Sequence, residues 1–399
     1  MSLRHGRGYL AIPGPSVMPD AVLQAMHAPA PNIYEGGLID LTDSLIPDLK
    51  KVAGTKGEAA IYIANGHGAW EGAVSNVFAP GDTVLVLATG RFCIGWGDMA
   101  AALGVKVQTL DFGKRATIDL DQVEQTLRAD TAGNIKAVMA VHTDTSTGVC
   151  NDIAALRRAI DATGHDALFM VDCICSLGCD EFHMDDWGVD VMVTACQKGL
   201  MTPPGLSFVF FNDKARGYRA RLGRVSSYWD WTPRVNPEVY YQYFCGTAPT
   251  HHLLGLRVAL DMIMDEGMAN VWARHATLAR AVWAACETWG QGGSLELNMP
   301  NPAHRSHAVT ALRIDAPDGT RLREWMEQNT GVTLGIGLGM AEPDDPAWHG
   351  FFRIGHMGHV NAHMVLGVLG GIEAGLAALD IPHTPGGVTA AVQVISDGA

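Results

Sequence analysis

Two apolar segments, ALFMVD at residues 167–172 and VDVMVTACQK at residues 189–198, decide the fold of this chain. Each is a nearly uninterrupted apolar run that leads to a charged residue, Asp172 in the first and Lys198 in the second. Short apolar runs without an alternating period are typical of strands buried on both faces, as in a parallel sheet covered by helices. A carboxylate and an amine at the ends of such strands cost desolvation energy unless they are paired or used. The two segments therefore predict a layered α/β fold and also the place of its functional site.

The flanking sequence extends the same pattern of short strands and longer helical segments. Further strands are expected at residues 59–63, 83–87, 105–110, 135–142 and 208–211. This alternation predicts an α/β fold with a mostly parallel sheet flanked by helices.

The domain organisation follows from a change in the sequence pattern beyond residue 250. There the short apolar runs give way to two long helical segments, which lead into a smaller α/β unit. We expect a large domain over residues 20–265 and a small C-terminal α/β domain over residues 266–385, against which residues 1–19 pack. The end of the chain is rich in Gly, Pro and Thr, which predicts a flexible tail over residues 386–399.

Composition narrows the class of protein. Of the 399 residues, 48% are hydrophobic and 18% are charged, as in an ordinary globular protein. The formal net charge of -14 argues against nucleic acid and against an anionic membrane surface, because both attract clustered Lys and Arg. No stretch approaches the ~18–20 apolar residues of a membrane helix, and the first residues lack the apolar core of a secretion signal. We expect a cytoplasmic metabolic enzyme with no nucleic acid or membrane as partner.

The eight cysteines lie mostly inside apolar segments, and disulfides are not expected in a cytosolic chain of this size. The cluster of Cys173, Cys175 and Cys179 has a C-x-C-x3-C spacing. It lacks the second pair of ligands that a zinc site needs, so no metal is predicted.

Small or polar residues follow the expected strands, at the edge where open α/β sheets bind ligands. The first strand leads to Gly66 and His67 at the start of a helix, where backbone N–H groups suit a phosphate. Phe92 follows the next strand and places an aromatic ring at the rim. Residues 142–148 (HTDTSTG) come after a third strand and are dense in hydroxyls.

Lys198 stands apart from the other seven lysines, which fall in helix ends, loops or polar edges. One interpretation is a buried salt bridge with Asp172. The other takes Lys198 as an amine that its apolar surroundings keep nucleophilic, able to form a Schiff base. With a carboxylate for a ring nitrogen, a phosphate cradle and a stacking aromatic, the second interpretation describes a site for pyridoxal 5′-phosphate.

Five blocks of sequence, in one order, carry a resemblance to a known family: GHGAWE (66–71), DTSTG (144–148), VD (171–172), QKGLMTPPG (197–205) and FRIGH (352–356). With them the chain resembles the class V, fold-type I aminotransferases, in the branch of the alanine–glyoxylate and serine–glyoxylate aminotransferases. The resemblance runs from residue 13 to about residue 379. It implies a fold-type I transferase that depends on pyridoxal 5′-phosphate and works as a homodimer with the active site at the subunit interface.

The resemblance also implies a role for each matching residue. Lys198 would hold the cofactor as a Schiff base and shuttle a proton, and Asp172 would pair with the ring nitrogen. Arg353 would bind the substrate α-carboxylate as a bidentate fork, the alternative being a surface ion pair. The remaining cofactor contacts would be Gly66, His67 and Gln197 at the phosphate, Phe92 and Ile174 on the two ring faces, Thr145 at the ring hydroxyl, and Thr247 of the neighbouring subunit at the phosphate.

Some segments depart from the family pattern. Many relatives carry a His-Arg pair where this chain has NIYEGG (32–37), so Tyr34 and Glu35 are expected near the substrate mouth. Phe244 falls where a relative's Tyr helps to bind the phosphate, although the adjacent Tyr243 leaves room for a one-residue slip. The aromatic run at 228–231 is expected in the core or a dimer contact, and the pair at 251–252 is expected as caps or satisfied polar residues.

The function that these observations favour is transfer of an amino group from a small amino acid, such as alanine or serine, to a 2-oxo acid, with glyoxylate favoured, by a ping-pong mechanism. A lyase or desulfurase of the same fold is an alternative that would need a mobile reactive cysteine; its candidates are Cys93, Cys150, Cys196 and Cys245. A second alternative is a non-catalytic binding protein that kept the fold. An intact set of Asp172, Gln197 and Lys198 argues against it.

Overall fold

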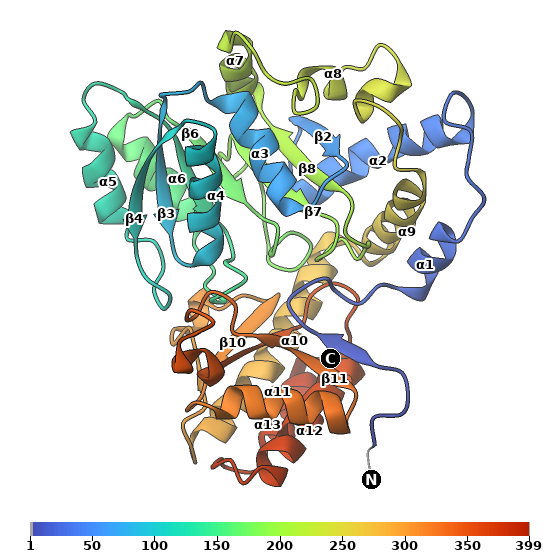
Figure 1. Cartoon of the computed structure of the whole chain (residues 1–399), viewed down its shortest axis with the longest axis vertical. Coiled ribbons are helices and arrows are strands. Elements are labelled where there is room, and N and C mark those ends of the chain that lie inside the picture. The colour runs from blue at the N-terminus through green and yellow to red at the C-terminus, as the bar shows by residue number, and fades with distance from the viewer. Residues whose placement is uncertain (1–2, 399) are drawn as a thin grey trace.

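The computed structural model describes residues 3–398, which form a large and a small layered unit (Figure 1). The large unit is built on a seven-stranded sheet of order β2-β8-β7-β6-β5-β3-β4. Strands β3 to β7 pair in parallel, and β8 is antiparallel to both β7 and β2. The strands are β2 (Glu58–Tyr62), β3 (Thr83–Ala88), β4 (Lys106–Asp111), β5 (Ile135–Val141), β6 (Leu168–Asp172), β7 (Val191–Ala195) and β8 (Ser207–Phe211). The predicted α/β fold with a mostly parallel, helix-flanked sheet is therefore confirmed.

Helices cover both faces of this sheet, because successive side chains of each strand point to opposite sides. Leu85 and Leu87 of β3 pack into one core cluster, and Val84 and Val86 pack into another. On the first face lie α1 (Asp20–Met26), α2 (Gly37–Ala53), α5 (Leu120–Ala129), α6 (Ile153–Thr163) and α9 (Thr250–Glu266). On the second face lie α3 (Gly66–Val77), α4 (Arg91–Ala102) and α7 (Asp213–Arg221).

The small unit is a five-stranded sheet of order β1-β11-β12-β10-β9 with helices packed on it. β1, near the start of the chain, pairs in parallel with β11 and so joins the N-terminal segment to this unit. The strands are β1 (Tyr9–Ala11), β9 (Glu296–Leu297), β10 (Val309–Arg313), β11 (Val332–Ile336) and β12 (Phe351–Gly355). The helices are α10 (Met268–Gly290), α11 (Asp318–Asn329), α12 (Ala362–Ala378) and α13 (Gly387–Gly398). Four short helical elements complete the described part of the chain: α8 (Thr232–Val235), η1 (Tyr240–Tyr243), η2 (Pro302–His304) and η3 (Pro346–Gly350).

The prediction of a flexible tail at residues 386–399 was wrong for its described part. Residues 387–398 form α13, which packs on α10 and α12. Val388, Val394 and Ile395 contact the core of the small unit, and Ala391 is fully buried. Their spacing presents an apolar stripe that holds the helix in place despite the Gly and Thr around it.

Part of the aromatic run at 228–231 belongs to the core, as one of the two expected placements had it: Trp231 lies in a core cluster and Trp229 packs against that cluster. Trp231 is buried and stacks on Phe211 of β8 with ring centroids 4.1 Å apart. The buried Arg234 just after the run donates to the carbonyls of Ile61 and Tyr243 at 2.8 and 2.9 Å. These bonds fix the segment against β2 and the end of η1. Among the described residues, no helix has the length and apolar character needed to cross a membrane.

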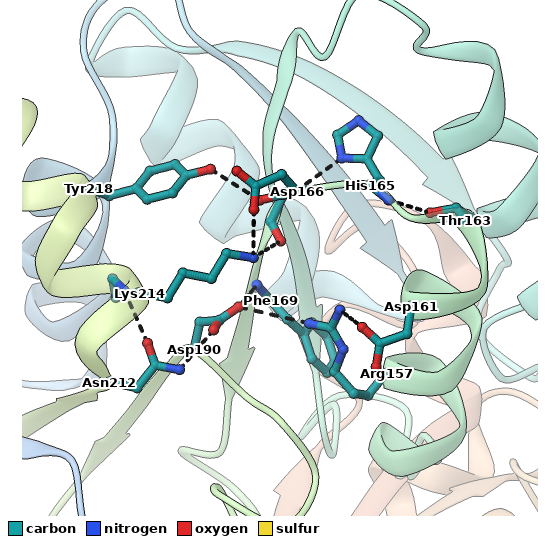
Figure 2. Close-up of polar contacts among 12 residues, drawn as sticks. Arg157, Asp161, Thr163, His165, Asp166, Phe169, Asp190, Asn212, Lys214 and Tyr218 are labelled. Atoms are coloured by element: carbon teal, nitrogen blue, oxygen red, sulfur yellow. Dashed lines mark hydrogen bonds and ion pairs between the residues drawn. The ribbon is translucent and has the colours of Figure 1, made fainter.

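A buried carboxylate fastens the amino-terminal edge of the large sheet. Asp190, just before β7, accepts a 2.7 Å hydrogen bond from the Phe169 amide of β6 and a 2.8 Å bond from Asn212 Nδ2 at the end of β8 (Figure 2). Arg157 of α6 lies 3.9 Å away on the same side. One side chain thus ties three neighbouring strands together at the edge opposite the ends that carry Asp172 and Lys198.

Replacing Asp190 with alanine should lower the free energy of unfolding by about 3 kcal/mol, because the Phe169 amide and the Asn212 side chain then lose a charged acceptor inside the protein. Urea unfolding followed by far-UV circular dichroism measures the change. Asp166→Ala is the matched control, since that carboxylate lies in the same region, is 87% exposed and forms a surface pair with Lys214. It should change the midpoint little. Equal shifts for the two variants would contradict the assignment.

Candidate active site

A cavity of about 290 Å³ lies at the carboxyl-terminal edge of the large sheet, which faces the small unit (Figure 1). Its walls come from the ends of several strands and from the N-terminal segment, as the strand-end rule for α/β sheets requires. The lining residues are Gly14, Pro15, Asn65, Gly66, His67, Trp70, Phe92, Val141, Thr143, Thr145, Asp172, Ile174, Gln197, Lys198 and Pro204. Eight of the residues predicted from the sequence are in this set: Gly66, His67, Phe92, Thr145, Asp172, Ile174, Gln197 and Lys198.

Asp172 is buried at the end of β6, and each of its oxygens has one donor. Oδ2 accepts a 2.8 Å bond from the indole Nε1 of Trp70, and Oδ1 accepts a 2.6 Å bond from the Ile174 amide. Burial raises the pKa of Asp172 to about 7, while the two donors oppose that rise. The carboxylate is therefore oriented and poised to gain or share a proton near neutral pH.

Lys198 follows β7 and is also buried. Its Nζ donates to the carbonyl of Pro13, and its own carbonyl accepts a 2.8 Å bond from Ser16 Oγ. Burial lowers the pKa of the amine, and the nearby Arg353 charge adds to that effect. Among the described residues no ion pair joins Lys198 to Asp172, whose donors are Trp70 and Ile174. The salt-bridge interpretation is therefore wrong, and a lysine with a lowered pKa is what Schiff-base chemistry needs.

The start of α3 forms one end of the cavity. The Asn65 side chain caps the helix by accepting from the His67 and Gly68 amides at 3.1 and 3.4 Å. A Cβ at Gly66 would lie 2.5 Å from Cδ1 of Ile174, so a larger residue at the helix start would displace the Ile174 side chain from its present position. Gln197 Oε1 is buried in this region and has no hydrogen-bond partner within the described chain. Backbone N–H groups at a helix start suit a bound phosphate. The unpaired Gln197 Oε1 is an acceptor, so it leaves a place for a ligand group that donates a hydrogen bond.

The aromatic wall of the cavity is fixed by a residue that sequence reasoning did not single out. Asp144 accepts from the Phe92 amide at 2.9 Å and from the Ser146 amide at 2.9 Å, which joins the start of α4 to the loop after β5. A Cβ at Gly90 would lie 2.4 Å from Cγ of Asp144. The DTSTG block (144–148) could have pointed to this residue. Its hydroxyls drew the attention, but the bonds that fix this loop go to the carboxylate of Asp144.

Arg353 of β12 connects the small unit to the wall of the cavity. Its Nε donates to the Ile336 carbonyl at 2.7 Å, and its Nη1 donates to the Thr145 carbonyl at 2.7 Å. The side chain is buried, and burial lowers its pKa to about 10. A surface ion pair is therefore the wrong interpretation of Arg353. It is a fixed cation between the two units, with Nη2 left without a bond to any described residue.

Four predicted site residues are not among those that line the cavity: Arg353, which is bonded to the carbonyl of the lining residue Thr145, and Thr247, Glu35 and Tyr34. Thr247 and Glu35 are exposed, and Tyr34 has a relative exposure of 84%. The two aromatic residues at the possible one-residue slip lie in different surroundings. Phe244 is buried in the core, and the Tyr243 hydroxyl donates to Asp43 at 2.9 Å.

The histidine pair consists of satisfied polar residues, as predicted. His251 Nε2 lies 3.0 Å from the Ala28 carbonyl, and His252 Nε2 lies 3.2 Å from the carbonyl of Pro204. Pro204 lines the cavity, so His252 braces that loop.

The cysteines do not offer the mobile thiol that a desulfurase requires. Cys93, Cys150 and Cys196 have pKa values raised by burial, and Cys245 is exposed without lining the described cavity. Within residues 3–398, no three His, Cys, Asp or Glu side chains come together as a metal site.

The donor set defines the class of enzyme. Each part of the cavity fits one part of pyridoxal 5′-phosphate. The buried lysine fits the carbon that forms the Schiff base, and the carboxylate held by two donors fits the ring nitrogen. The helix that starts at Gly66 fits the phosphate, and the aromatic wall fits the ring. This is the site of a pyridoxal-phosphate enzyme.

Comparison with known proteins gives the family. The family model described as aminotransferase class-V matches residues 48–361. The serine–glyoxylate aminotransferase of Methylorubrum extorquens is 39% identical over 97% of this chain and 96% of its own length. The L-aspartate–glyoxylate aminotransferase of Paracoccus denitrificans is 34% identical over 96% and 94%. The solved pyridoxamine–pyruvate aminotransferase of Mesorhizobium loti is similar with a TM-score of 0.88 and 25% identity over 100% of both chains. The chain belongs to the class V aminotransferases and is a pyridoxal-phosphate-dependent transaminase.

The substitution Gly14→Ala should weaken binding of pyridoxal 5′-phosphate to the apoenzyme by ~tenfold or more. A Cβ there would lie 2.5 Å from Cδ of Lys198, and Gly14 has a φ of +93°, which favours glycine. Titration followed by the visible absorbance of the bound cofactor measures the affinity. Gly8→Ala is the control from the same segment, because its Cβ would have only an ordinary 3.7 Å contact with the Gly331 carbonyl. Unchanged affinity in Gly14→Ala would show that the lysine side chain is not confined as described.

Proposed function

We propose that this transaminase moves the amino group of a small amino acid, such as serine, alanine or aspartate, to a 2-oxo acid, with glyoxylate as the acceptor, by a ping-pong mechanism. The observation that carries the proposal is that the buried Lys198 and Asp172 line one cavity, and that the buried Arg353 of the small unit donates to the carbonyl of Thr145 in the wall of that cavity. The named relatives that act on glyoxylate support the choice of acceptor.

The cofactor would be held at several points by residues of this chain. Asp172 would pair with the ring nitrogen, Phe92 and Ile174 would lie on the two ring faces, and Thr145 would bond the ring hydroxyl. Gly66, His67 and Gln197 would bind the phosphate. When bound, the cofactor supplies an electron sink that stabilises negative charge at the amino acid Cα.

Lys198 would act as the base and acid of the reaction. Its Nζ, with a pKa lowered by burial, would accept the proton released at the substrate Cα, hold it, and donate it again later in the reaction. The Pro13 carbonyl, which accepts from Nζ in the structure, orients the amine. The surrounding apolar walls keep water from competing for that proton.

Arg353 would orient the substrate. Because its Nε and Nη1 are bonded to backbone carbonyls, the guanidinium plane is fixed, and the free side of the group can bind the α-carboxylate. The same carboxylate is present in the amino acid and in the oxo acid, so one clamp serves both half-reactions. Lysine could not replace this planar donor.

The test is a half-reaction with the cofactor-loaded enzyme. Serine, alanine and aspartate are added singly, without an oxo acid, and the visible absorbance of the cofactor is followed. One of them should remove the visible band, and glyoxylate should restore it.

Lys198→Ala should lower turnover by about 10⁴-fold or more while the fold is retained, because the residue makes the proton transfer. A band that glyoxylate cannot restore would contradict the proposed acceptor, and appreciable turnover in Lys198→Ala would contradict the role of the lysine.

We also propose that the enzyme is a homodimer with each site completed by its partner, and that it works in the cytoplasm. Thr247, Tyr34 and Glu35 are exposed in the single chain, as are the apolar side chains of Ile63 and Tyr241. A dimer would bury such groups, placing Thr247 at the phosphate and Tyr34 and Glu35 at the substrate mouth of the other subunit. The eight free cysteines support a reducing compartment.

Complementation between two inactive variants tests the shared site. Lys198→Ala and Thr247→Glu chains are co-expressed with different tags, and the mixed dimer is purified. If Thr247 serves the opposite subunit, the mixed dimer has one intact site and should regain about half of the wild-type activity, because its other site carries both changes. Sedimentation should give twice the chain mass of 42.6 kDa. A mixed dimer no more active than its parents would place Thr247 in its own subunit's site.

A further inference from the structure

Trp70 lies one helical turn inside α3 and reaches the floor of the cavity. Its side chain is buried, and its indole Nε1 donates to Asp172 Oδ2 at 2.8 Å. The Ile174 amide occupies Oδ1 at 2.6 Å. The plane of the carboxylate is therefore fixed from both sides, by a side chain from one element and a backbone group from another.

The indole also determines how Asp172 carries its charge. Burial favours the protonated form of this carboxyl, and a hydrogen bond from a neutral donor favours the ionised form. The titratable groups that face Asp172 are Asp144, Lys198, Cys93 and Cys173. Asp144 and Lys198 act on it in opposite directions, so the indole and the Ile174 amide are the contacts that keep the charge in place.

The helix that carries Trp70 also begins at Gly66, at the phosphate end of the cavity. One rigid element thus sets the distance between the two ends of the cavity. Trp70 is itself held by its neighbours: Trp96 stacks at 6.3 Å with rings 17° apart, Phe92 lies edge-on at 6.3 Å, and the His67 ring lies 4.5 Å away.

We propose that Trp70 is a positioning residue that orients Asp172 and holds it ionised for the ring nitrogen of the cofactor. The inference rests on the proposed role of Asp172. No substrate atom is contacted by Trp70 in this role, and its effect on the reaction passes entirely through the carboxylate.

The experiment compares Trp70→Phe with Trp96→Phe. Both variants lose the same atoms from a buried tryptophan of the same cluster, but Trp96 Nε1 has no hydrogen-bond partner among the described residues, so only the first loses a donor. Apoenzymes are titrated with pyridoxal 5′-phosphate and with its 1-deaza analogue, in which a CH replaces the ring nitrogen. Trp70→Phe should bind the natural cofactor ~tenfold more weakly than wild type, and Trp96→Phe should stay within about threefold of wild type.

The analogue separates the proposed role from simple packing. Because it has no ring nitrogen, its affinity should be the same in wild type, Trp70→Phe and Trp96→Phe within about threefold. The pH profile of cofactor affinity gives a second readout: without the indole donor, ionisation of Asp172 needs a higher pH, so the acid limb should move up by about one pH unit in Trp70→Phe alone.

A third variant keeps the proposal testable if Trp70→Phe folds poorly. In Trp70→His, the imidazole Nε2 occupies the ring position of the indole nitrogen, so the donor is retained while the benzene ring is lost. Its acid limb should lie closer to wild type than that of Trp70→Phe. Equal weakening of both ligands in Trp70→Phe, or an acid limb that does not move, would overturn the proposal. Asp172→Asn addresses the underlying assignment: if it binds the cofactor and the analogue with the same ratio as wild type, Asp172 itself is not the ring-nitrogen partner.

Discussion

The desolvated carboxylate of Asp172 is the constraint on which the site depends. A carboxylate at the end of a fully buried strand is costly, and two hydrogen bonds compensate part of that cost without a permanent counter-charge. Each bond fixes a different element: the indole fixes α3, and the Ile174 amide fixes the turn after β6. Because Gly66 and Ile174 then approach closely, the helix start and the floor of the cavity become one rigid unit.

The two edges of the large sheet use buried charge differently. At the amino-terminal edge, Asp190 is bonded to groups of β6 and of the chain after β8, and its only task is to hold those strands together. At the carboxyl-terminal edge, Gln197 Oε1 lacks a partner within residues 3–398, and Lys198 forms no ion pair with a carboxylate of those residues. The carboxyl-terminal edge, where the buried amine and the amide oxygen line one cavity, is the edge at which open α/β sheets bind their ligands.

Much of this could be predicted from the sequence, because strand-end positions are set by local patterns. Asp172, Lys198 and Gly66 each follow a recognisable apolar run, and the structure places all three in one cavity. Asp144 and Trp70 could not be assigned, since their roles depend on contacts between elements far apart in the chain. The C-terminal helix was missed because Gly and Thr concealed its apolar stripe. Thr247, Tyr34 and Glu35 are exposed, and a single chain does not reveal what would cover them.

The position of Arg353 depends on how the two units are arranged. The residue belongs to the small unit, yet its Nη1 is bonded to the Thr145 carbonyl of the large unit, while the N-terminal segment pairs with β11 and also contacts Lys198. Two separate connections thus fix the small-unit guanidinium relative to the large-unit amine. Since the α-carboxylate and the reacting Cα of an amino acid are one bond apart, this fixed spacing suits any donor at its common end. Discrimination between donors would then depend on the groups that meet the side chain, which is the role proposed for Tyr34 and Glu35 across the dimer.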